Sequence, residues 1–288
     1  MLDWLPKNVK SRLRQYYYGT RSAYLRWRHP FSADDLLSAL RRLGVAEGDV
    51  ILVHSAFAEF VGFEGGAPDV IRVLKDAVGA SGTVIMPTLS FSGTAVAYAR
   101  QAKVFDPRKT PSQVGLLTEV FRRSKGVTRS LHPTHSVAIF STEADYFVKD
   151  HHLAGTPCGK GTPFFRLFEK NGKVLLLGVG VAAVTFFHCV EELVEPDLPF
   201  SPFTSEVFSM QCTVDGKIVE TAPMRLYDPG VSGRRDLSIL ESALRKKGVW
   251  HQEKVGNLKL IALKAADILS TTRELAKQGV YCYRKADA

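Results

Sequence analysis

Val174-Leu175-Leu176-Leu177, followed at once by Gly178-Val179-Gly180, is the segment that most clearly indicates the class of fold. A continuous apolar run of this kind is typical of a strand covered on both faces, as the strands of parallel sheets are. Shorter apolar runs at 50–53, 83–86 and 137–140 predict further strands, and stretches with helical spacing separate them. This alternation predicts an α/β fold in which a mainly parallel central sheet carries helices on both faces.

Two helix starts are marked by capping residues. Ser32 and Asp35 form a capping box ahead of leucines at helical spacing. Thr110-Pro111-Ser112-Gln113 predicts a second start, with a capping threonine, proline in the first turn and glutamine closing the box, and that helix is expected to end near Gly126.

The last third of the chain predicts a small antiparallel β addition. Residues 210–214 and 217–219 flank Asp215-Gly216, which is typical of a hairpin turn. A strand at 258–263 and an amphipathic helix to Lys277 follow. With no internal repeat or long linker, we predict a single α/β domain over residues 31–288 and a separate N-terminal segment over 1–30.

The composition is that of a globular protein. Of the 288 residues, 45% are hydrophobic and 23% charged, which excludes disordered, collagen-like and disulfide-framework chains. The four cysteines have no paired spacing and are expected to be reduced thiols of a cytoplasmic protein. The longest apolar run, residues 174–184, is far shorter than the roughly 20 residues of a membrane span.

The formal net charge of +9 is unevenly distributed. Residues 1–30 hold seven basic side chains and one acidic one, interleaved with tryptophan and tyrosine, so this tenth of the chain carries two thirds of the excess. Basic and aromatic residues together suit a membrane interface or a nucleic-acid backbone. A helix that packs its aromatic side chains on the body and keeps its charges in water is the alternative.

His188 is the most informative single residue. It follows the 174–180 segment within Thr185-Phe186-Phe187-His188-Cys189-Val190-Glu191-Glu192. With Thr185 as N-cap, His188 lies in the first helical turn, where Glu191 and Glu192 can both share its face. A carboxylate on one ring nitrogen fixes the tautomer and leaves the other nitrogen free as a base. An ordinary helix pair without chemistry is the alternative.

His132 and His135 offer a second possible chemistry. Together with His188 and Glu191 they could ligate a zinc ion, which would make the chain a metal-dependent hydrolase. The sequence has no HExxH spacing, and Pro133 keeps residues 132–135 from being helical. We therefore expect no metal.

Glycines before a helix start predict a possible anion site. Gly65 and Gly66 precede apolar residues at helical spacing, and Ser55 lies at the end of the 50–53 strand. Free backbone N–H groups at a helix start bind phosphate groups. A glycine turn that only serves the chain's geometry is the alternative.

Several short motifs occur in a fixed order that is more specific than any one of them. They are Val53-His54-Ser55, Gly65-Gly66-Ala67, Met86-Pro87-Thr88, Arg129-Ser130 with His132-Pro133, Gly159-Lys160-Gly161-Thr162-Pro163, and Leu177-Gly178-Val179-Gly180 with Thr185, His188 and Glu191. Over residues 32–275 this order resembles the aminoglycoside 3-N-acetyltransferase family, also called the antibiotic N-acetyltransferase family. The resemblance implies an α/β fold unlike that of GNAT acetyltransferases. It also implies transfer of an acetyl group from acetyl-coenzyme A to an amine of an amino sugar.

The resemblance assigns roles to particular residues. His188 corresponds to the family's motif histidine, which we expect to be the general base, with Glu191 as its partner, and His152 matches a family histidine of the acceptor pocket. The acidic charge of Glu192, which lies outside that correspondence, makes it a further candidate at the acceptor. The expected coenzyme A site comprises His54, Ser55, Gly65 and Gly66, with Thr88 and Ser136 as weaker candidates that could also stabilise the oxyanion.

Departures from the family pattern bear on the acceptor. Ser55-Ala56 replaces a serine pair, and residues 181–184 are apolar where the resistance enzymes are polar. A chain at +9 also repels polycations at long range. We therefore expect a weakly charged amino sugar, linked to a nucleotide or lipid carrier in polysaccharide biosynthesis, with an aminoglycoside antibiotic as the alternative.

Partners and location follow from the same reasoning. Residues 1–30 would contact a membrane or lipid carrier, which places the protein in the cytoplasm at the inner face of the membrane. Nucleic acid is not an expected partner, and the sequence leaves a homo-oligomer open. A non-catalytic adaptor acting through residues 1–30 is a third class of function, which the intact pair of His188 and Glu191 disfavours.

Overall fold

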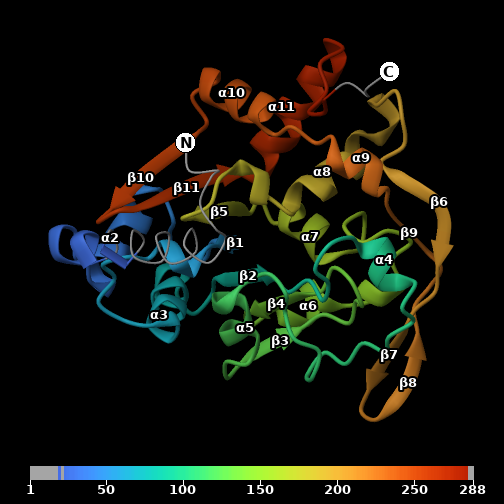
Figure 1. Ribbon diagram of the computed structural model, residues 1–288, viewed down its shortest axis with the longest axis horizontal. Coiled ribbons are helices and arrows are strands. Elements are labelled where there is room, and N and C mark those ends of the chain that lie inside the picture. Colours follow the sequence, from blue (N-terminus) through green and yellow to red (C-terminus); the bar gives the residue numbers. More distant parts are fainter. Residues whose placement is uncertain (1–18, 21–22, 285–288) are drawn as a thin grey trace, which may run out of the picture.

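A seven-stranded sheet forms the centre of the computed structural model, which describes residues 19–20 and 23–284 (Figure 1). Its strand order is β10-β11-β5-β1-β2-β4-β3. In chain order the strands are β1 (Val50–Ser55), β2 (Thr83–Pro87), β3 (Val127–Arg129), β4 (Val137–Phe140), β5 (Lys173–Leu177), β10 (His251–Val255) and β11 (Leu258–Lys264).

The direction of the strands confirms the predicted class. β1 pairs in parallel with both β2 and β5, and the pairs β2–β4, β3–β4, β5–β11 and β10–β11 are antiparallel. Five strands therefore point the same way, and only β4 and β11 run against them. The sheet is mainly parallel, with its parallel pairs at the centre.

Helices cover both faces of the sheet. One face carries α2 (Ala33–Arg42), α3 (Ala67–Val78) and α5 (Leu116–Arg122), and the other carries α6 (Ala144–Val148), α7 (Pro163–Glu169), α8 (Phe186–Val194), α10 (Ser238–Lys246) and α11 (Ala265–Lys277). Side chains of a strand alternate between faces, so Ile51 and Val53 join one core and Leu52 joins the other. The predicted arrangement of helices on both faces is confirmed.

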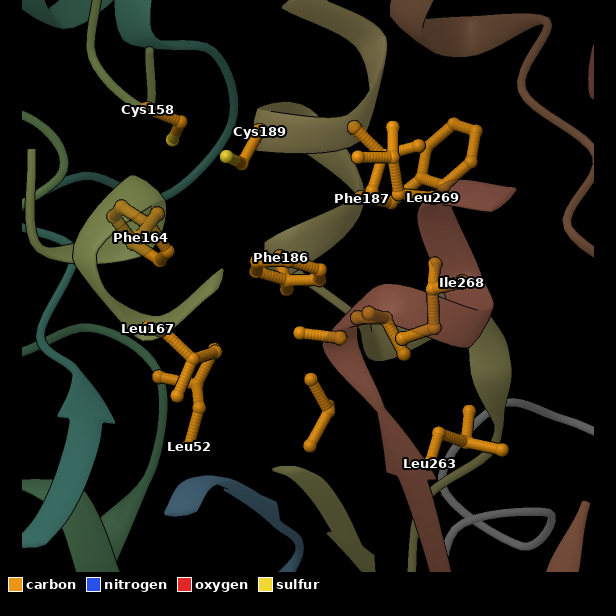
Figure 2. Close-up of a cluster of buried hydrophobic side chains, with 14 of the residues drawn as sticks. Leu52, Cys158, Phe164, Leu167, Phe186, Phe187, Cys189, Leu263, Ile268 and Leu269 are labelled. Atoms are coloured by element: carbon orange, nitrogen blue, oxygen red, sulfur yellow. The ribbon is translucent and has the colours of Figure 1, made fainter. Parts of the chain in front are cut away.

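The core around α8 fixes the helix that bears His188. Figure 2 shows Phe186 between Phe164 of α7 on one side and Ile268 of α11 on the other. All three side chains are almost fully buried. Close packing of this kind leaves a helix little freedom to shift, so the first turn of α8 is held firmly against the sheet.

Two small antiparallel sheets lie outside the main one. β6 (Phe203–Phe208) pairs with β9 (Met224–Tyr227), and β7 (Gln211–Val214) pairs with β8 (Lys217–Glu220). The turn between β7 and β8 is the predicted one: Asp215 and Gly216 both have positive φ, 47° and 79°, as a type I′ hairpin turn requires. Two further short α-helices are α4 (Ala95–Ala99) and α9 (Pro229–Gly233), and single 3-10 turns lie at Phe57–Glu59, His151–Leu153, Val181–Ala183 and Glu195–Asp197.

The helix predicted from Thr110 begins later than expected. α5 starts at Leu116, after Gly115 with φ 118°. The hydroxyl of Thr110 accepts the Asp106 N–H, and its carbonyl accepts from the half-buried side chain of Arg129. The segment is therefore held as a loop on the sheet edge, and contacts distant in sequence override its local capping signal. α5 also ends at Arg122, because residues 127–129 form the unpredicted edge strand β3.

The N-terminal segment is described only in part. Residues 23–28 are helical, with Leu25 buried but Tyr24 and Trp27 exposed at 56% and 76%, so these two aromatic side chains do not pack on the body as the helix alternative expects. The other aromatic and most basic residues of the segment lie outside the described residues. The boundary at residue 30 and the membrane or lipid-carrier contact stay predictions. None of the helices in the described ranges is both long and apolar enough to cross a membrane.

Candidate active site

A cavity of about 430 Å³ opens at the carboxyl ends of β1, β2 and β5. Ligand sites of α/β sheets form at this edge of the sheet. The strands and the segments that follow them supply the lining, which is Val53, His54, Ser55, Pro87, Leu89, Val114, Thr118, Val179, Ala183 and Thr185.

α8 brings His188 to the same edge. The chain leaves β5, makes a 3-10 turn at Val181–Ala183 and enters α8 at Phe186. Thr185 occupies the N-cap position, but its backbone is already helical and its side chain makes no capping hydrogen bond. The predicted cap is therefore wrong in detail, while His188 lies in the first turn as expected.

Glu191 holds the imidazole of His188. Nδ1 of His188 lies 3.0 Å from Oε2 of Glu191, whose side chain is completely buried. Arg235 binds the same carboxylate with two nitrogens, at 2.9 Å to Oε1 and 2.8 Å to Oε2. The hydroxyl of Tyr283 donates to Oε1 as well. A buried charge needs such partners to be tolerated.

The charges of Glu191 and Arg235 determine which ring nitrogen of His188 can act as a base. Burial alone would raise the pKa of Glu191, but the hydrogen bond from His188 and the charge of Arg235 hold that pKa below its ordinary value. Burial lowers the pKa of His188, and its bond to Glu191 only partly offsets this. The imidazole is therefore neutral at pH 7, with its hydrogen on Nδ1 facing the carboxylate. Nε2 carries the lone pair and has no hydrogen-bond partner among the described residues.

Glu192 does not share the face of His188. Its carboxylate accepts hydrogen bonds from the hydroxyls of Thr156 and Tyr227 and, at 3.0 Å, from the Cys158 N–H. Burial raises the pKa of Glu192 to about 7. Its oxygens are therefore occupied within the protein, which disfavours the direct contact with the acceptor that we expected of it.

His54 and Ser55 line the cavity with unused polar atoms. Nε2 of His54 and Oγ of Ser55 are both buried without a hydrogen-bond partner, although such groups in proteins are nearly always paired. Burial lowers the pKa of His54 to about 4, so its ring is neutral. Both atoms are available to a bound ligand.

The glycine turn offers fewer free donors than the sequence suggests. Gly66 is the N-cap of α3, and its N–H donates to the carboxylate of Asp69 at 2.9 Å. An anion of the protein itself therefore occupies that donor. Neither Gly65 nor Gly66 is among the residues that line the cavity, and their contact with coenzyme A stays a prediction.

Thr88 and Ser136 are bound to one another and to Arg129. Their hydroxyl oxygens are 3.0 Å apart, and Nε of Arg129 lies 3.0 Å and 3.1 Å from them. Both residues are completely buried. In this arrangement both hydroxyls are engaged by Arg129 and by each other, which disfavours them as contacts to coenzyme A or to an oxyanion. Their place in the site stays a prediction.

His132, His135 and His151 form a buried group behind His188. His132 accepts the His135 N–H on Nδ1 at 3.0 Å, and His135 uses its own Nδ1 toward the Thr134 hydroxyl at 2.9 Å. Nε2 of His132 is buried without a partner. Among the residues that the structure describes, no three His, Cys, Asp or Glu side chains are placed to hold a metal ion. The set proposed for zinc therefore does not converge on one point.

His152 is half-buried beside this group, where its backbone carbonyl accepts the Ala222 N–H at 3.0 Å. No described contact links its side chain to His188, so its place at the acceptor stays a prediction.

Three residues of the site escape prediction from sequence. Arg235 and Tyr283 meet Glu191 from 44 and 92 residues away, and Tyr227 stacks on His188 with ring centroids 4.0 Å apart. None stands in a motif with fixed spacing to His188. A buried carboxylate at Glu191 does imply a cationic partner, but the sequence does not say which arginine it is.

Comparison with known proteins agrees with this geometry. Residues 52–277 match the family model described as aminoglycoside 3-N-acetyltransferase. Aminoglycoside N(3)-acetyltransferase IV of Salmonella sp is 30% identical over 241 residues, which are 82% of this chain and 84% of that protein. The chain belongs to the aminoglycoside 3-N-acetyltransferase family. The predicted resemblance is confirmed at the level of the family, and with it the prediction of an N-acetyltransferase.

Solved structures of related enzymes share the fold. A mutant of aminoglycoside acetyltransferase AAC(3)-IVa in complex with a gentamicin is 26% identical, with a TM-score of 0.74 over 89% of this chain and 93% of that one. AAC-IIIb in a binary complex with CoASH has the same TM-score over 88% and 99% of the two chains, but at 22% identity that likeness concerns the fold alone.

The expected acceptor is wrong. The relatives in this family are aminoglycoside N(3)-acetyltransferases, and nothing in them favours a sugar-nucleotide or lipid-carrier acceptor of polysaccharide biosynthesis. Salt screens net charge over about 8–10 Å, so the side chains near the site, rather than the +9 of the whole chain, govern binding of a polycation. Most of that excess lies in residues 1–30.

Proposed function

We propose that the protein transfers the acetyl group of acetyl-coenzyme A to the 3-amino group of an aminoglycoside antibiotic, with His188 as the general base. The observation that carries this proposal is the buried pair of His188 and Glu191, with Nε2 of the imidazole left free. Membership of the aminoglycoside 3-N-acetyltransferase family supports the choice of substrates.

The reaction needs removal of one proton from the acceptor. The amine attacks the thioester carbonyl, the C–N bond forms, and the C–S bond breaks to release the coenzyme A thiol. Nε2 of His188 takes the proton from the attacking nitrogen and gives it to the sulfur of the leaving coenzyme A. Between these two transfers the imidazolium is stabilised by ionised Glu191. Arg235 keeps Glu191 ionised and oriented.

We place the thioester end of coenzyme A in the cavity at the strand ends. His54 and Ser55 offer buried polar atoms without partners there, and Thr185, one helical turn before His188, lines the same space. The amine is expected to approach from the exposed side of the imidazole, where 17% of the side chain is accessible.

We place the cationic acceptor near the carboxyl end of α8. Asp197 stands exposed at the 3-10 turn that follows α8, beside the partly exposed Glu195, whose Oε1 pairs with Arg225 and accepts the Ser201 hydroxyl. Carboxylates attract the ammonium groups of an aminoglycoside at short range. His152 is the further candidate for contact with the sugar.

A thiol-release assay tests the proposal. With gentamicin as acceptor, His188→Ala is expected to lower kcat by about 10²–10⁴-fold, which is the usual contribution of a general base. The exposed His251 provides the matched control, since His251→Ala should retain wild-type kcat. Wild-type turnover by His188→Ala would contradict the assigned base, and failure of the wild-type chain to acetylate any aminoglycoside would contradict the acceptor.

A further inference from the structure

The imidazole of His188 rests on an aromatic ring. Tyr227 of β9 lies nearly parallel to it, with ring centroids 4.0 Å apart and an angle of 27° between the planes. His135 meets the edge of the same imidazole at 5.6 Å and 84°. The orientation of the ring is thus constrained at Nδ1 by Glu191, on one face by Tyr227 and at one edge by His135.

Tyr227 is itself firmly held. Its hydroxyl donates to Oε1 of Glu192, which also accepts the Cys158 N–H. Phe203, its register partner across β6 and β9, stacks on Tyr227 at 5.3 Å and 20°. Burial raises the pKa of Tyr227 well above its ordinary value, so the phenol keeps its proton.

Glu191 and Glu192, which are neighbours on α8, therefore bind different partners. Successive helical side chains point about 100° apart, so Glu191 reaches the nitrogen of His188 while Glu192 reaches the hydroxyl of Tyr227. Both contacts lead to the same imidazole, one directly and one through an aromatic ring.

We propose that the aromatic ring of Tyr227 positions the base. The inference rests on the proposed function, in which His188 accepts the proton of the acceptor amine. A stacked ring fixes the plane of the imidazole and so the direction of the Nε2 lone pair. The face of the phenol also stabilises the positive charge that His188 acquires, since aromatic faces attract cations within about 6 Å of the ring centroid.

The charged and titratable groups around His188 come from four elements of the described chain. Glu191 faces it from α8 itself, Arg235 from the segment after α9 at 3.4 Å, His135 from the segment before β4, and Tyr227 from β9. Since Tyr227 donates its hydrogen to Glu192, it neither gives nor takes a proton in the reaction.

The test compares three substitutions in the stack. Tyr227→Leu removes the ring on which His188 stacks, and Tyr227→Phe keeps that ring and loses only the hydroxyl. Phe203→Leu removes the ring of β6 that stacks on Tyr227. We expect Tyr227→Leu to lower the single-turnover rate of acetyl transfer about tenfold, with KM for acetyl-coenzyme A and gentamicin within about twofold of wild type. The other two variants should stay within about threefold in rate.

A spectroscopic signature checks the geometry without any turnover. Because the two rings stack at 4.0 Å, ring current from Tyr227 is expected to shift the NMR signals of the His188 ring protons upfield in the wild type. Tyr227→Leu should abolish that shift, while Phe203→Leu should keep it. If Tyr227→Leu does not fold, Tyr227→Met replaces it, because the unbranched side chain fills irregular space.

The outcomes separate this inference from the proposed function. A wild-type rate for the folded leucine or methionine variant, or a loss that Phe203→Leu shares equally, overturns the role of Tyr227 while leaving His188 as the base. Wild-type turnover by His188→Ala would instead overturn the proposed function itself.

Discussion

Glu191 shows how one buried residue depends on partners from three parts of the chain. His188, Arg235 and Tyr283 all reach its carboxylate, which is fully buried. Without them the charge would be too costly in this environment, and the group would take up a proton instead. Only the histidine at i−3 belongs to a local pattern, so the sequence predicts this pair but not the other two partners.

A substitution that removes the charge of Glu191 but keeps the shape of its side chain tests the part of Glu191 in catalysis. Glu191→Gln still offers an oxygen to Nδ1 of His188, but it no longer stabilises the imidazolium. We expect kcat in the thiol-release assay to fall by about 10²-fold, and the leftover charge of Arg235 to lower stability as well. Glu220→Gln, at the exposed end of β8, is the control and should leave kcat unchanged. Equal rates for the two variants would contradict the role of Glu191.

At the scale of elements, local signals were reliable where no distant contact competed. The capping box at Ser32 and the turn at Asp215-Gly216 occur as predicted, because each is stabilised by atoms within a few residues. The signal at Thr110 failed because Arg129, on a different element of the chain, binds that segment as a loop. β3 escaped prediction because a three-residue edge strand carries almost no periodicity.

The N-cap of α2 allows a direct measurement of how much one local hydrogen-bond pattern contributes to the free energy of unfolding. Ser32 accepts the Asp35 N–H on its hydroxyl, and the Asp35 carboxylate accepts the Ser32 N–H at 2.8 Å. We expect Ser32→Ala to lower the free energy of unfolding by about 1 kcal/mol, seen as a drop in Tm of about 2–4 °C. Ser209→Ala, at an exposed position between strands, should change Tm by less than half as much. An unchanged Tm for Ser32→Ala would mean that packing alone fixes this helix end.

The molecule as a whole buries several neutral imidazoles. Burial lowers the pKa values of His54, His132, His135, His151 and His188, to about 4 for His54 and about 3 for His151. In the unfolded chain these groups titrate near pH 6.5. Below that pH the unfolded state binds protons that the folded state does not, so the folded state loses stability on acidification.

We therefore predict that the folding stability of the whole molecule falls on acidification. Each buried neutral histidine should cost about 1.4 kcal/mol per pH unit between pH 6.5 and its own lowered pKa, so Tm should fall steeply between pH 7 and pH 5. His132→Asn keeps an acceptor for the His135 N–H and removes one titrating ring. We expect it to lower Tm at pH 7 but to make the pH dependence less steep. His251→Gln, at an exposed position, should follow the wild type; an equally steep dependence for His132→Asn would contradict this account.

The sequence alone determined the alternation of strands and helices, the hairpin turn, the family, and the placing of Glu191 one turn after His188, because each depends on residues close together or on motifs in a fixed order. The tertiary structure alone decided that Arg235 and Tyr283 complete the carboxylate site, that Glu192 turns toward Tyr227, and that Arg129 occupies Thr88 and Ser136. Local spacing fixes which side chains of one helix share a face. Which distant side chain meets that face depends on how the whole chain packs, since contacts between distant segments form only when their combined burial outweighs the entropy of closing the loops between them.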